Sequence, residues 1–283
     1  MLSETTTISA LAAPRRVQDF FSAKAQGQRL SMVTCYDYTF ARLLGVSTVD
    51  AILVGDSAAM VVHGHSSTLL ATVDLMRIHT EAVARGLATG RPTASGGKFI
   101  VADMPFLSFR KGVTAALDAA QTLMTAGANA VKLEGVDGHE DVIQRLTQSG
   151  IPVMGHLGLQ PQSLRAYGGF HVQGRSATAA REISRQARTL EELGAFAVVL
   201  ECIPASLARE VTASLQIPTI GIGAGDGCDG QILVLQDLLG LNIDFHPRFA
   251  RPFQNGAENV LNAVADFDRA VKTGTFPAAE ESY

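Results

Sequence analysis

The chain has 283 residues, of which 47% are hydrophobic and 18% charged, and its formal net charge is −4. This balance is typical of a globular protein with a large core, and the slightly negative charge provides no basic surface for nucleic acid or an anionic membrane. No apolar run reaches the roughly 18 residues of a membrane span. Three widely spaced cysteines, Cys35, Cys202 and Cys228, favour reduced thiols and a cytoplasmic protein.

The first residues, 1–15, are expected to form a flexible arm rather than a signal peptide, because no basic region precedes an apolar core. A helix is predicted at 16–25, since Val17, Phe20 and Phe21 have helical spacing. Strands are expected at residues 31–36, 49–56, 99–103, 130–134, 151–155, 196–201, 219–222 and 243–245. Helices are expected at residues 38–44, 73–85, 112–126, 137–150, 177–193, 204–215, 229–239 and 257–273.

This alternation gives close to eight strand–helix repeats at a steady interval, with no linker or shift in composition. The pattern predicts a single-domain α/β fold, the (β/α)8 TIM barrel, over residues 16–275, followed by a tail at 276–283. The main rival fold is a doubly wound sheet. That fold usually carries a Gly-rich phosphate turn after its first strand, and the sequence has none there.

Four of the predicted strands end on an acidic residue. These residues are Asp56, Asp103, Glu134 and Glu201. Any one of them could be a helix cap or a structural ion pair. Ligands of parallel α/β folds, however, bind outside the carboxyl ends of the strands, where four unpaired carboxylates would repel one another. A cation or a shared proton would relieve this repulsion. All-oxygen ligation suits a hard cation, so we expect Mg²⁺ rather than zinc near Asp56, Asp103 and Glu134, with Glu201 across the barrel mouth as a base.

Two further ionisable residues lie on these strands. Lys132 is two residues before Glu134, so both side chains point to the same side of their strand. Lys132 could form a Schiff base, hold a substrate carboxylate by charge, or simply pair with Glu134. The many nearby acids favour the charged form. His156 follows the fifth strand, where a substrate hydrogen bond or a proton relay competes with a purely structural role.

Other motifs admit plainer interpretations. The glycine-rich run GIGAGDG at 221–227 is either a phosphate-binding loop or a tight turn, and it matches neither the dinucleotide nor the P-loop pattern. His63 and His65 lie in a long loop, 57–72, that they could simply order. Cys202 has no obvious base partner, which disfavours a nucleophilic role. The loops at 57–72 and 157–175 are long enough to close over a site.

Several stretches together resemble the ketopantoate hydroxymethyltransferase family, from about residue 31 to residue 253. They are CYDY at 35–38, LVGDS at 53–57, ADMPF at 102–106, VKLEG at 131–135, GHLGLQPQ at 155–162, GGFHVQGR at 168–175, LECIP at 200–204 and GIGAGDGCDGQ at 221–231. The chain departs from the family in its longer N-terminal arm and in His171, where the family often has Lys.

The resemblance implies a TIM barrel enzyme that moves a hydroxymethyl group from 5,10-methylenetetrahydrofolate to 3-methyl-2-oxobutanoate in pantothenate biosynthesis, often as a homodecamer. By the same resemblance Asp56, Asp103 and Glu134 surround Mg²⁺, and Glu201 is the proton acceptor. The keto acid would contact Asp56, Ser57, Asp103 and Lys132. A 2-oxo acid that chelates a metal suits this set, since the metal stabilises the enolate formed when C3 loses its proton.

Two alternatives remain open from the sequence. One is a Mg²⁺-dependent carbon–carbon lyase of the isocitrate lyase or phosphoenolpyruvate mutase type, which shares the metal-binding acids but needs no folate. The other is a non-catalytic barrel that binds a metabolite. Turnover without folate would favour the lyase. Binding of the keto acid without loss of its C3 proton would favour the non-catalytic barrel.

Overall fold

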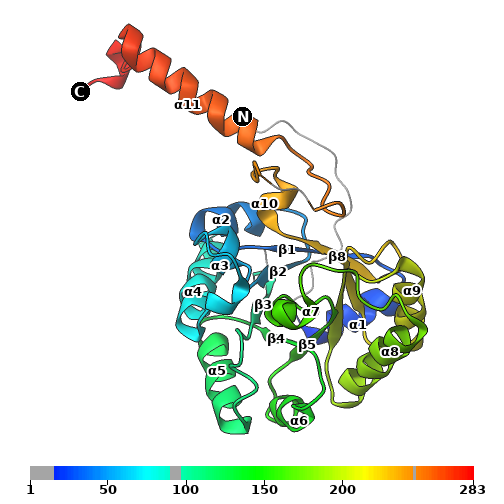
Figure 1. Cartoon of the computed structure of the whole chain (residues 1–283). Coiled ribbons are helices and arrows are strands. Elements are labelled where there is room, and N and C mark those ends of the chain that lie inside the picture. Colours follow the sequence, from blue (N-terminus) through cyan, green and yellow to red (C-terminus); the bar gives the residue numbers. More distant parts are fainter. Residues whose placement is uncertain (1–15, 90–96, 245–246) are drawn as a thin grey trace. The chain divides into compact units, whose positions relative to one another are not determined.

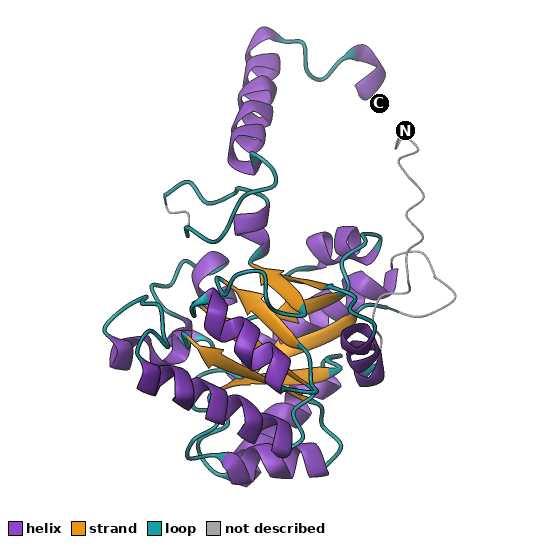
Figure 2. Cartoon of the chain, turned by 90° about the vertical axis from the view of Figure 1, so that its right-hand side faces the viewer, coloured by secondary structure: helices purple, strands orange, loops and turns teal. Residues whose placement is uncertain are grey.

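The computed structural model describes residues 16–89, 97–244 and 247–283, so the predicted arm at 1–15 lies outside the described residues. Eight parallel strands close into a barrel in the order β1 to β8, which confirms the predicted (β/α)8 fold. Figure 2 shows the strands surrounded by helices. The strands are β1 (Leu30–Thr34), β2 (Ala51–Val54), β3 (Phe99–Asp103), β4 (Ala130–Glu134), β5 (Val153–Gly158), β6 (Ala197–Glu201), β7 (Thr219–Ile222) and β8 (Gly230–Leu233).

Polar side chains cap the starts of α2 (Tyr38–Gly45) and α8 (Ala177–Glu192). Asp37 accepts a hydrogen bond from Phe40 N at 2.9 Å and starts α2, and Ser176 accepts one from Ala179 N at 3.2 Å and starts α8. No described helix is long and apolar enough to cross a membrane. The helices (Figure 1) are α1 (Val17–Ala25), α2 (Tyr38–Gly45), α3 (Ala58–Val61), α4 (Val73–Thr89), α5 (Val113–Thr125), α6 (Glu140–Gln148), α7 (Leu164–Tyr167), α8 (Ala177–Glu192), α9 (Ala205–Ser214), α10 (Leu235–Leu238) and α11 (Gly256–Thr273), with 3-10 turns η1 (Thr68–Leu70), η2 (Pro161–Ser163) and η3 (Ala279–Glu281).

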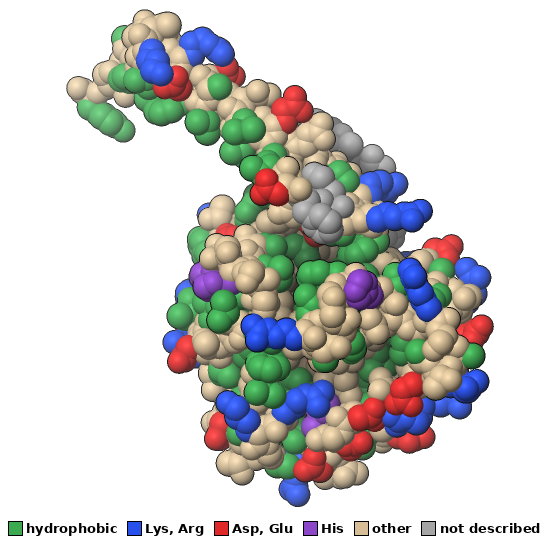
Figure 3. Space-filling view, viewed as in Figure 1, with side chains coloured by type: hydrophobic (Ala, Val, Ile, Leu, Met, Phe, Trp, Pro, Cys, Tyr) green, Lys and Arg blue, Asp and Glu red, His purple; other side chains and the backbone are tan. Residues whose placement is uncertain are grey.

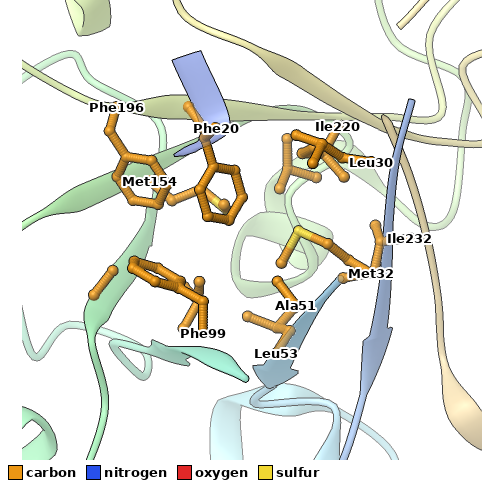
Figure 4. Close-up of a cluster of buried hydrophobic side chains, with 14 of the residues drawn as sticks. Phe20, Leu30, Met32, Ala51, Leu53, Phe99, Met154, Phe196, Ile220 and Ile232 are labelled. Atoms are coloured by element: carbon orange, nitrogen blue, oxygen red, sulfur yellow. The ribbon is translucent and has the colours of Figure 1, made fainter. Parts of the chain in front are cut away.

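The interior of the barrel is apolar at the amino-terminal ends of the strands. Phe20 of α1 closes this end, and its ring centroid lies 5.1 Å from that of Phe99 and 5.2 Å from that of Phe196, both in edge-to-face contact (Figure 4). Met32 and Met154 belong to the same buried cluster. Since this end is filled with hydrocarbon, polar chemistry is confined to the opposite, carboxyl end of the strands.

The eighth strand is not where the sequence predicted it. A helix was expected at 229–239, but Gly230–Leu233 forms β8, and the helix α10 is only Leu235–Leu238. Of the strand expected at 243–245, Ile243 and Asp244 lie in a bend and residue 245 lies outside the described residues. Gly230 explains the difference, because a Cβ at this position would lie 2.6 Å from Leu30 O. Only glycine lets β8 approach β1 closely enough to close the barrel.

The chain folds as two compact units, one that ends at Ile232 and one that begins at Leu233. In the second unit, Phe253 N donates to Leu238 O and Gly256 N donates to Leu239 O, both at 2.8 Å, so the start of α11 is tied to the end of α10. Apolar side chains form a row along one side of α11, as Figure 3 shows. The row contains Val260, Val264, Phe267 and Val271.

Candidate active site

The predicted site residues come together at the carboxyl ends of β2 to β6. Strand register is responsible, because Asp103 is paired with Lys132 and Glu134 with His156 on neighbouring strands. Glu201 is the last residue of β6. Asp56, Asp103, Lys132, Glu134 and His156 are each at most 5% exposed. A chain of short contacts, described below, joins all of the acids, the lysine and the histidine.

Lys132 is the positive charge among these acids. Its Nζ lies 2.8 Å from Asp103 Oδ1, and both side chains are buried. Burial by itself lowers the pKa of Lys132, but the charges of Asp103, Asp56 and Glu134 outweigh it and raise the pKa above its ordinary value. Lys132 is therefore a cation at neutral pH, which supports a charge-based role and argues against a Schiff base.

His156 bridges the centre of the acid cluster to Glu201. Its Nε2 lies 3.1 Å from Glu201 Oε2, and its Nδ1 lies 3.5 Å from Glu134 Oε1 and 3.3 Å from Lys132 Nζ. Burial and the charge of Lys132 lower the pKa of His156, but hydrogen bonds to Glu134 and Glu201 overcome them and raise it to about 9. His156 is therefore a cation at neutral pH and lies beside Glu201 as its charge partner.

The ionisation of Asp56 is opposed by its surroundings. Burial raises its pKa well above the ordinary value, and the nearby charges of Asp103 and Glu134 raise it further. Its backbone N donates to Asp103 Oδ2 at 2.9 Å, which fixes the two acids side by side. Four ionised carboxylates, those of Asp56, Asp103, Glu134 and Glu201, would exceed the two positive charges of Lys132 and His156, so the site has the electrostatic character of a cation site.

Gln162 is a residue of the site to which the sequence assigned no role. It lies in η2, and both its side chain and its backbone contact the acids. Its Nε2 donates to Asp56 Oδ2 at 2.8 Å and to Met104 O at 3.0 Å, and its backbone N donates to Glu134 Oε2 at 3.0 Å. Among the described residues, no three acidic, histidine or cysteine side chains are grouped so that they could hold a metal ion.

The donor set nevertheless fits Mg²⁺ in its chemistry. Asp56, Asp103 and Glu134 provide buried carboxylate oxygens from three consecutive strands, and oxygen ligands are what this ion requires. Gln162 Nε2 occupies Asp56 Oδ2 in this structure, so an ion bound through that oxygen would displace the amide.

Ser57 stands at the start of α3, beside Asp56. Its Oγ lies 2.8 Å from Tyr36 OH. Burial raises the pKa of Tyr36, and the charges of Asp103 and Asp56 add to this effect, so the phenol stays neutral. Tyr36 is the second site residue that sequence reasoning missed. It stands in the CYDY motif, which was the only signal available for it.

The glycine-rich run at 221–227 packs as a tight turn. A Cβ on Gly225 would lie 2.4 Å from Ala205 Cβ, and a Cβ on Gly227 would lie 2.9 Å from Arg209 Cβ. The glycines thus allow the turn to press against α9, which supports the turn over a phosphate loop. Cys202 follows Glu201, and burial together with that charge raises its pKa to about 12, so it is a poor nucleophile.

The histidines of the loop after β2 connect that loop to α4. His63 Nε2 lies 2.9 Å from His79 Nε2, and His79 Nδ1 donates to Tyr36 O at 2.6 Å. The rings of His63 and His65 stack with their centroids 6.4 Å apart. This loop also touches the loop after β5, because η1 packs against η2. These contacts support the interpretation that His63 and His65 order the loop.

Comparisons with solved structures place the fold. The chain superposes on phosphonopyruvate hydrolase in complex with oxalate and Mg²⁺ with a TM-score of 0.59 and 13% identity, covering 94% of this chain and 92% of that one. It superposes on 2,3-dimethylmalate lyase, a member of the PEP mutase/isocitrate lyase superfamily, with a TM-score of 0.56 and 16% identity, covering 94% and 91%. At these identities the likeness shows a shared barrel fold.

Comparisons with sequences are more specific. The profile of the ketopantoate hydroxymethyltransferase family matches residues 14–279. The 3-methyl-2-oxobutanoate hydroxymethyltransferase of Bdellovibrio bacteriovorus is 50% identical over 269 residues, covering 95% of this chain and 99% of the relative. That of Coxiella burnetii is 52% identical over 263 residues, covering 93% and 96%. The chain therefore belongs to the ketopantoate hydroxymethyltransferase family and is a transferase.

Proposed function

We propose that this enzyme transfers a hydroxymethyl group from 5,10-methylenetetrahydrofolate to C3 of 3-methyl-2-oxobutanoate and so forms 2-dehydropantoate. In this reaction the C3–H bond breaks and a C3–CH₂ bond forms. Water supplies the hydroxyl oxygen, and tetrahydrofolate leaves. The observation that carries the proposal is the position of Lys132, a buried cation 2.8 Å from Asp103 in the middle of the strand-end acids. An anionic 2-oxo acid needs such a cation, and its enolisation needs the acids.

The metal we propose is Mg²⁺, held by Asp56, Asp103 and Glu134. The support is the excess of buried carboxylates and the raised pKa of Asp56, which burial and the neighbouring acids cause and which a bound cation relieves. When bound, the ion supplies a Lewis acid that stabilises negative charge on the keto oxygen of the substrate. The same residues and Ser57 would lie against the keto acid, whose carboxylate would pair with Lys132.

The proton acceptor we propose is Glu201. Its side chain is 16% exposed, whereas His156, which holds it, is 3% exposed. The other acids of the cluster are at most 5% exposed. Glu201 is therefore the acid that an entering substrate can reach most easily. His156, 3.1 Å away, is a cation beside this carboxylate and orients it by charge.

The carbon–carbon lyase alternative is less well supported. It rests on solved structures that share the fold at 13% and 16% identity, and folds host many chemistries. The discriminating experiment is to incubate the enzyme with 3-methyl-2-oxobutanoate and Mg²⁺, with and without 5,10-methylenetetrahydrofolate, and to identify products by mass spectrometry. The proposal requires 2-dehydropantoate only when the donor is present. Cleavage of a carbon–carbon bond without the donor would instead favour the lyase.

We also propose a homodecamer in the cytoplasm. The apolar row of α11, Val260 to Val271, supports self-association, because a surface helix with such a row buries it against another surface. The three cysteines are all free thiols, as suits a reducing compartment. Light scattering on a size-exclusion column tests the assembly. A mass of one chain in solution would contradict it.

A further inference from the structure

A cavity of about 280 Å³ lies beside the carboxyl ends of β4 and β5. None of the residues that line it belongs to the metal, keto acid or proton-transfer roles described above. Its walls come from the segments after β3, β4 and β5 and from the first turns of α8. It is lined by Arg110, Gly135, Asp137, Gly158, Gln160, Tyr167, Gln173, Gly174, Ala179, Glu182, Ile183 and Gln186.

Glycine backbone lines the side of this cavity next to the acid cluster. Gly135 directly follows Glu134, and a Cβ there would lie 3.1 Å from Arg110 Nη2. Gly158 is paired in register with Glu201, and a Cβ on it would lie 2.1 Å from Glu201 O. A side chain at Gly158 would collide with the backbone of Glu201, and the positive φ of 75° at Gly135 favours glycine there. A flat molecule in the cavity can therefore lie directly against the backbone that carries Glu134 and Glu201.

The cavity wall presents a positive charge that no acid neutralises. Arg110 donates from Nη2 to Glu134 O at 3.2 Å and from Nη1 to Asp137 O at 3.3 Å. Within the described part of the chain, no carboxylate lies within ion-pair distance of this guanidinium, so Arg110 can pair with an anionic ligand. The cavity also presents an aromatic ring, Tyr167, close enough to Glu134 for that charge to help burial raise its pKa.

The remaining polar groups of the cavity are amides. Gln160 makes no side-chain hydrogen bond to any described residue, although it is only 8% exposed. Gln173 donates from Nε2 to His171 O at 2.9 Å, which leaves its Oε1 as an acceptor. An amide offers both a donor and an acceptor. The two amides can therefore hydrogen-bond to the edge of a heterocycle on which ring N–H, amino and carbonyl groups alternate.

We propose that this cavity binds the one-carbon donor, a reduced pteridine that carries a benzoylglutamate tail. The proposal rests on the proposed function, which requires such a donor next to the keto acid. The ring lies along the glycine backbone, the amides of Gln160 and Gln173 bind its polar edge, and Arg110 pairs with a carboxylate of the tail. The reactive carbon then faces the ends of β4 and β6, where Glu134 and Glu201 stand.

The test compares two adjacent alanines of α8. Ala179 lines this cavity, whereas Ala180 lines a separate groove formed with α9. Ala179→Phe should raise the donor KM by about tenfold or more, since a phenyl ring occupies much of the cavity. It should leave the keto acid KM and the donor-independent exchange of the C3 proton within about twofold of the parent enzyme. Ala180→Phe should change none of these values.

A second pair tests the charge. Arg110→Met should raise the donor KM by about tenfold, because a hydrogen-bonded ion pair with a carboxylate is lost, and Arg110→Lys should recover part of it. Arg181→Met, on the groove that Ala180 lines, is the control. This pair decides the question if Ala179→Phe does not fold. Donor KM values that are unchanged in Ala179→Phe or Arg110→Met, or raised equally in the controls, would overturn the proposal.

A wrong proposed function would give a different result from a wrong donor cavity. If the function is wrong, the parent enzyme itself would neither exchange the C3 proton nor form product, and the donor-cavity proposal would be overturned as well. A parent enzyme that exchanges and forms product, but whose Ala179→Phe and Arg110→Met variants keep the parent donor KM, would leave the function intact and overturn the cavity alone.

Discussion

Gln162 Nε2 lies 2.8 Å from Asp56 Oδ2, although the two residues are 106 positions apart in the chain. The bond fastens the loop after β5 onto the acid that follows β2. It also occupies an oxygen that a metal ion would use. The Gln162 amide and the proposed cation would therefore compete for Asp56.

Replacing Gln162 by leucine should reveal this competition. Without the amide, Asp56 loses a buried partner, so the metal-free Gln162→Leu variant should be less stable by about 1–3 kcal/mol. Added Mg²⁺ should then raise the melting temperature more in the variant than in the parent enzyme, because the ion replaces the lost partner. Gln160→Leu, in the same loop but with no bond to the acids, is the control. Equal Mg²⁺-induced shifts in all three proteins would contradict the competition.

Neutral substitutions of Glu201 and Asp103 should impair different steps, turnover in the first case and substrate binding in the second. Glu201→Gln should keep metal-dependent binding of 3-methyl-2-oxobutanoate, measured by calorimetry, and lose turnover by about 10²–10⁴-fold, as expected of a general base. Asp103→Asn should lose the metal-dependent binding itself, since it removes a ligand and the partner of Lys132. If the two variants behaved alike, the assigned roles would be wrong.

Lys132 should act through its charge and form no covalent bond. Borohydride added to a mixture of enzyme and keto acid should give no adduct in the intact mass, because the raised pKa keeps the amine protonated. Lys132→Met should also destabilise the protein by about 3–5 kcal/mol, since it leaves Asp103 buried without its cation. A reduced adduct mapped to Lys132 would establish the Schiff base instead.

His139 should make the stability of the protein depend on pH. Burial and the charge of Arg110 lower its pKa from 6.5 to about 4. Above pH 6.5 the imidazole is neutral in both the folded and unfolded states. Below pH 6.5 His139 binds a proton in the unfolded chain but stays neutral in the folded chain. Up to about 3 kcal/mol of the free energy of unfolding is therefore lost as the pH falls from 6.5 to 4.

The measurement for His139 is urea unfolding across this range, compared with His139→Asn. The variant should lose less stability than the parent enzyme between pH 6.5 and 4. His171→Asn, at an exposed position, should follow the parent curve. Parallel curves for the parent and His139→Asn would show that this histidine does not contribute.

The sequence alone was sufficient to predict the barrel and the acids at its mouth. Three hydrophobic runs that end on a carboxylate are strands in the structure. Asp103, Glu134 and Glu201 are the last residues of β3, β4 and β6. The eighth strand was missed because Gly230 gives no hydrophobic signal. Its role depends on the distance to Leu30, which only the closed barrel sets.

The missing site residues have a similar cause. Gln162 and Tyr36 are uncharged, so neither gave the carboxylate signal, although Tyr36 ends the strand that the sequence predicted at 31–36. Their function arises from contacts with Asp56 and Ser57, made across the barrel mouth by folded loops. Charge and periodicity predict which elements meet. The position of a neutral side chain in a loop depends on packing that the pattern does not encode.

All of the proposed roles depend on one proposed step, in which the strand-end acids enolise a 2-oxo acid with the help of a metal ion. Proton NMR of 3-methyl-2-oxobutanoate in D₂O, with enzyme and Mg²⁺ but no folate, observes this step by itself when the experiment is repeated after EDTA. We predict that the C3 proton exchanges, that EDTA stops the exchange, and that Glu201→Gln shows none. Exchange that survives EDTA, or that persists in Glu201→Gln, would contradict metal-assisted enolisation with Glu201 as the base.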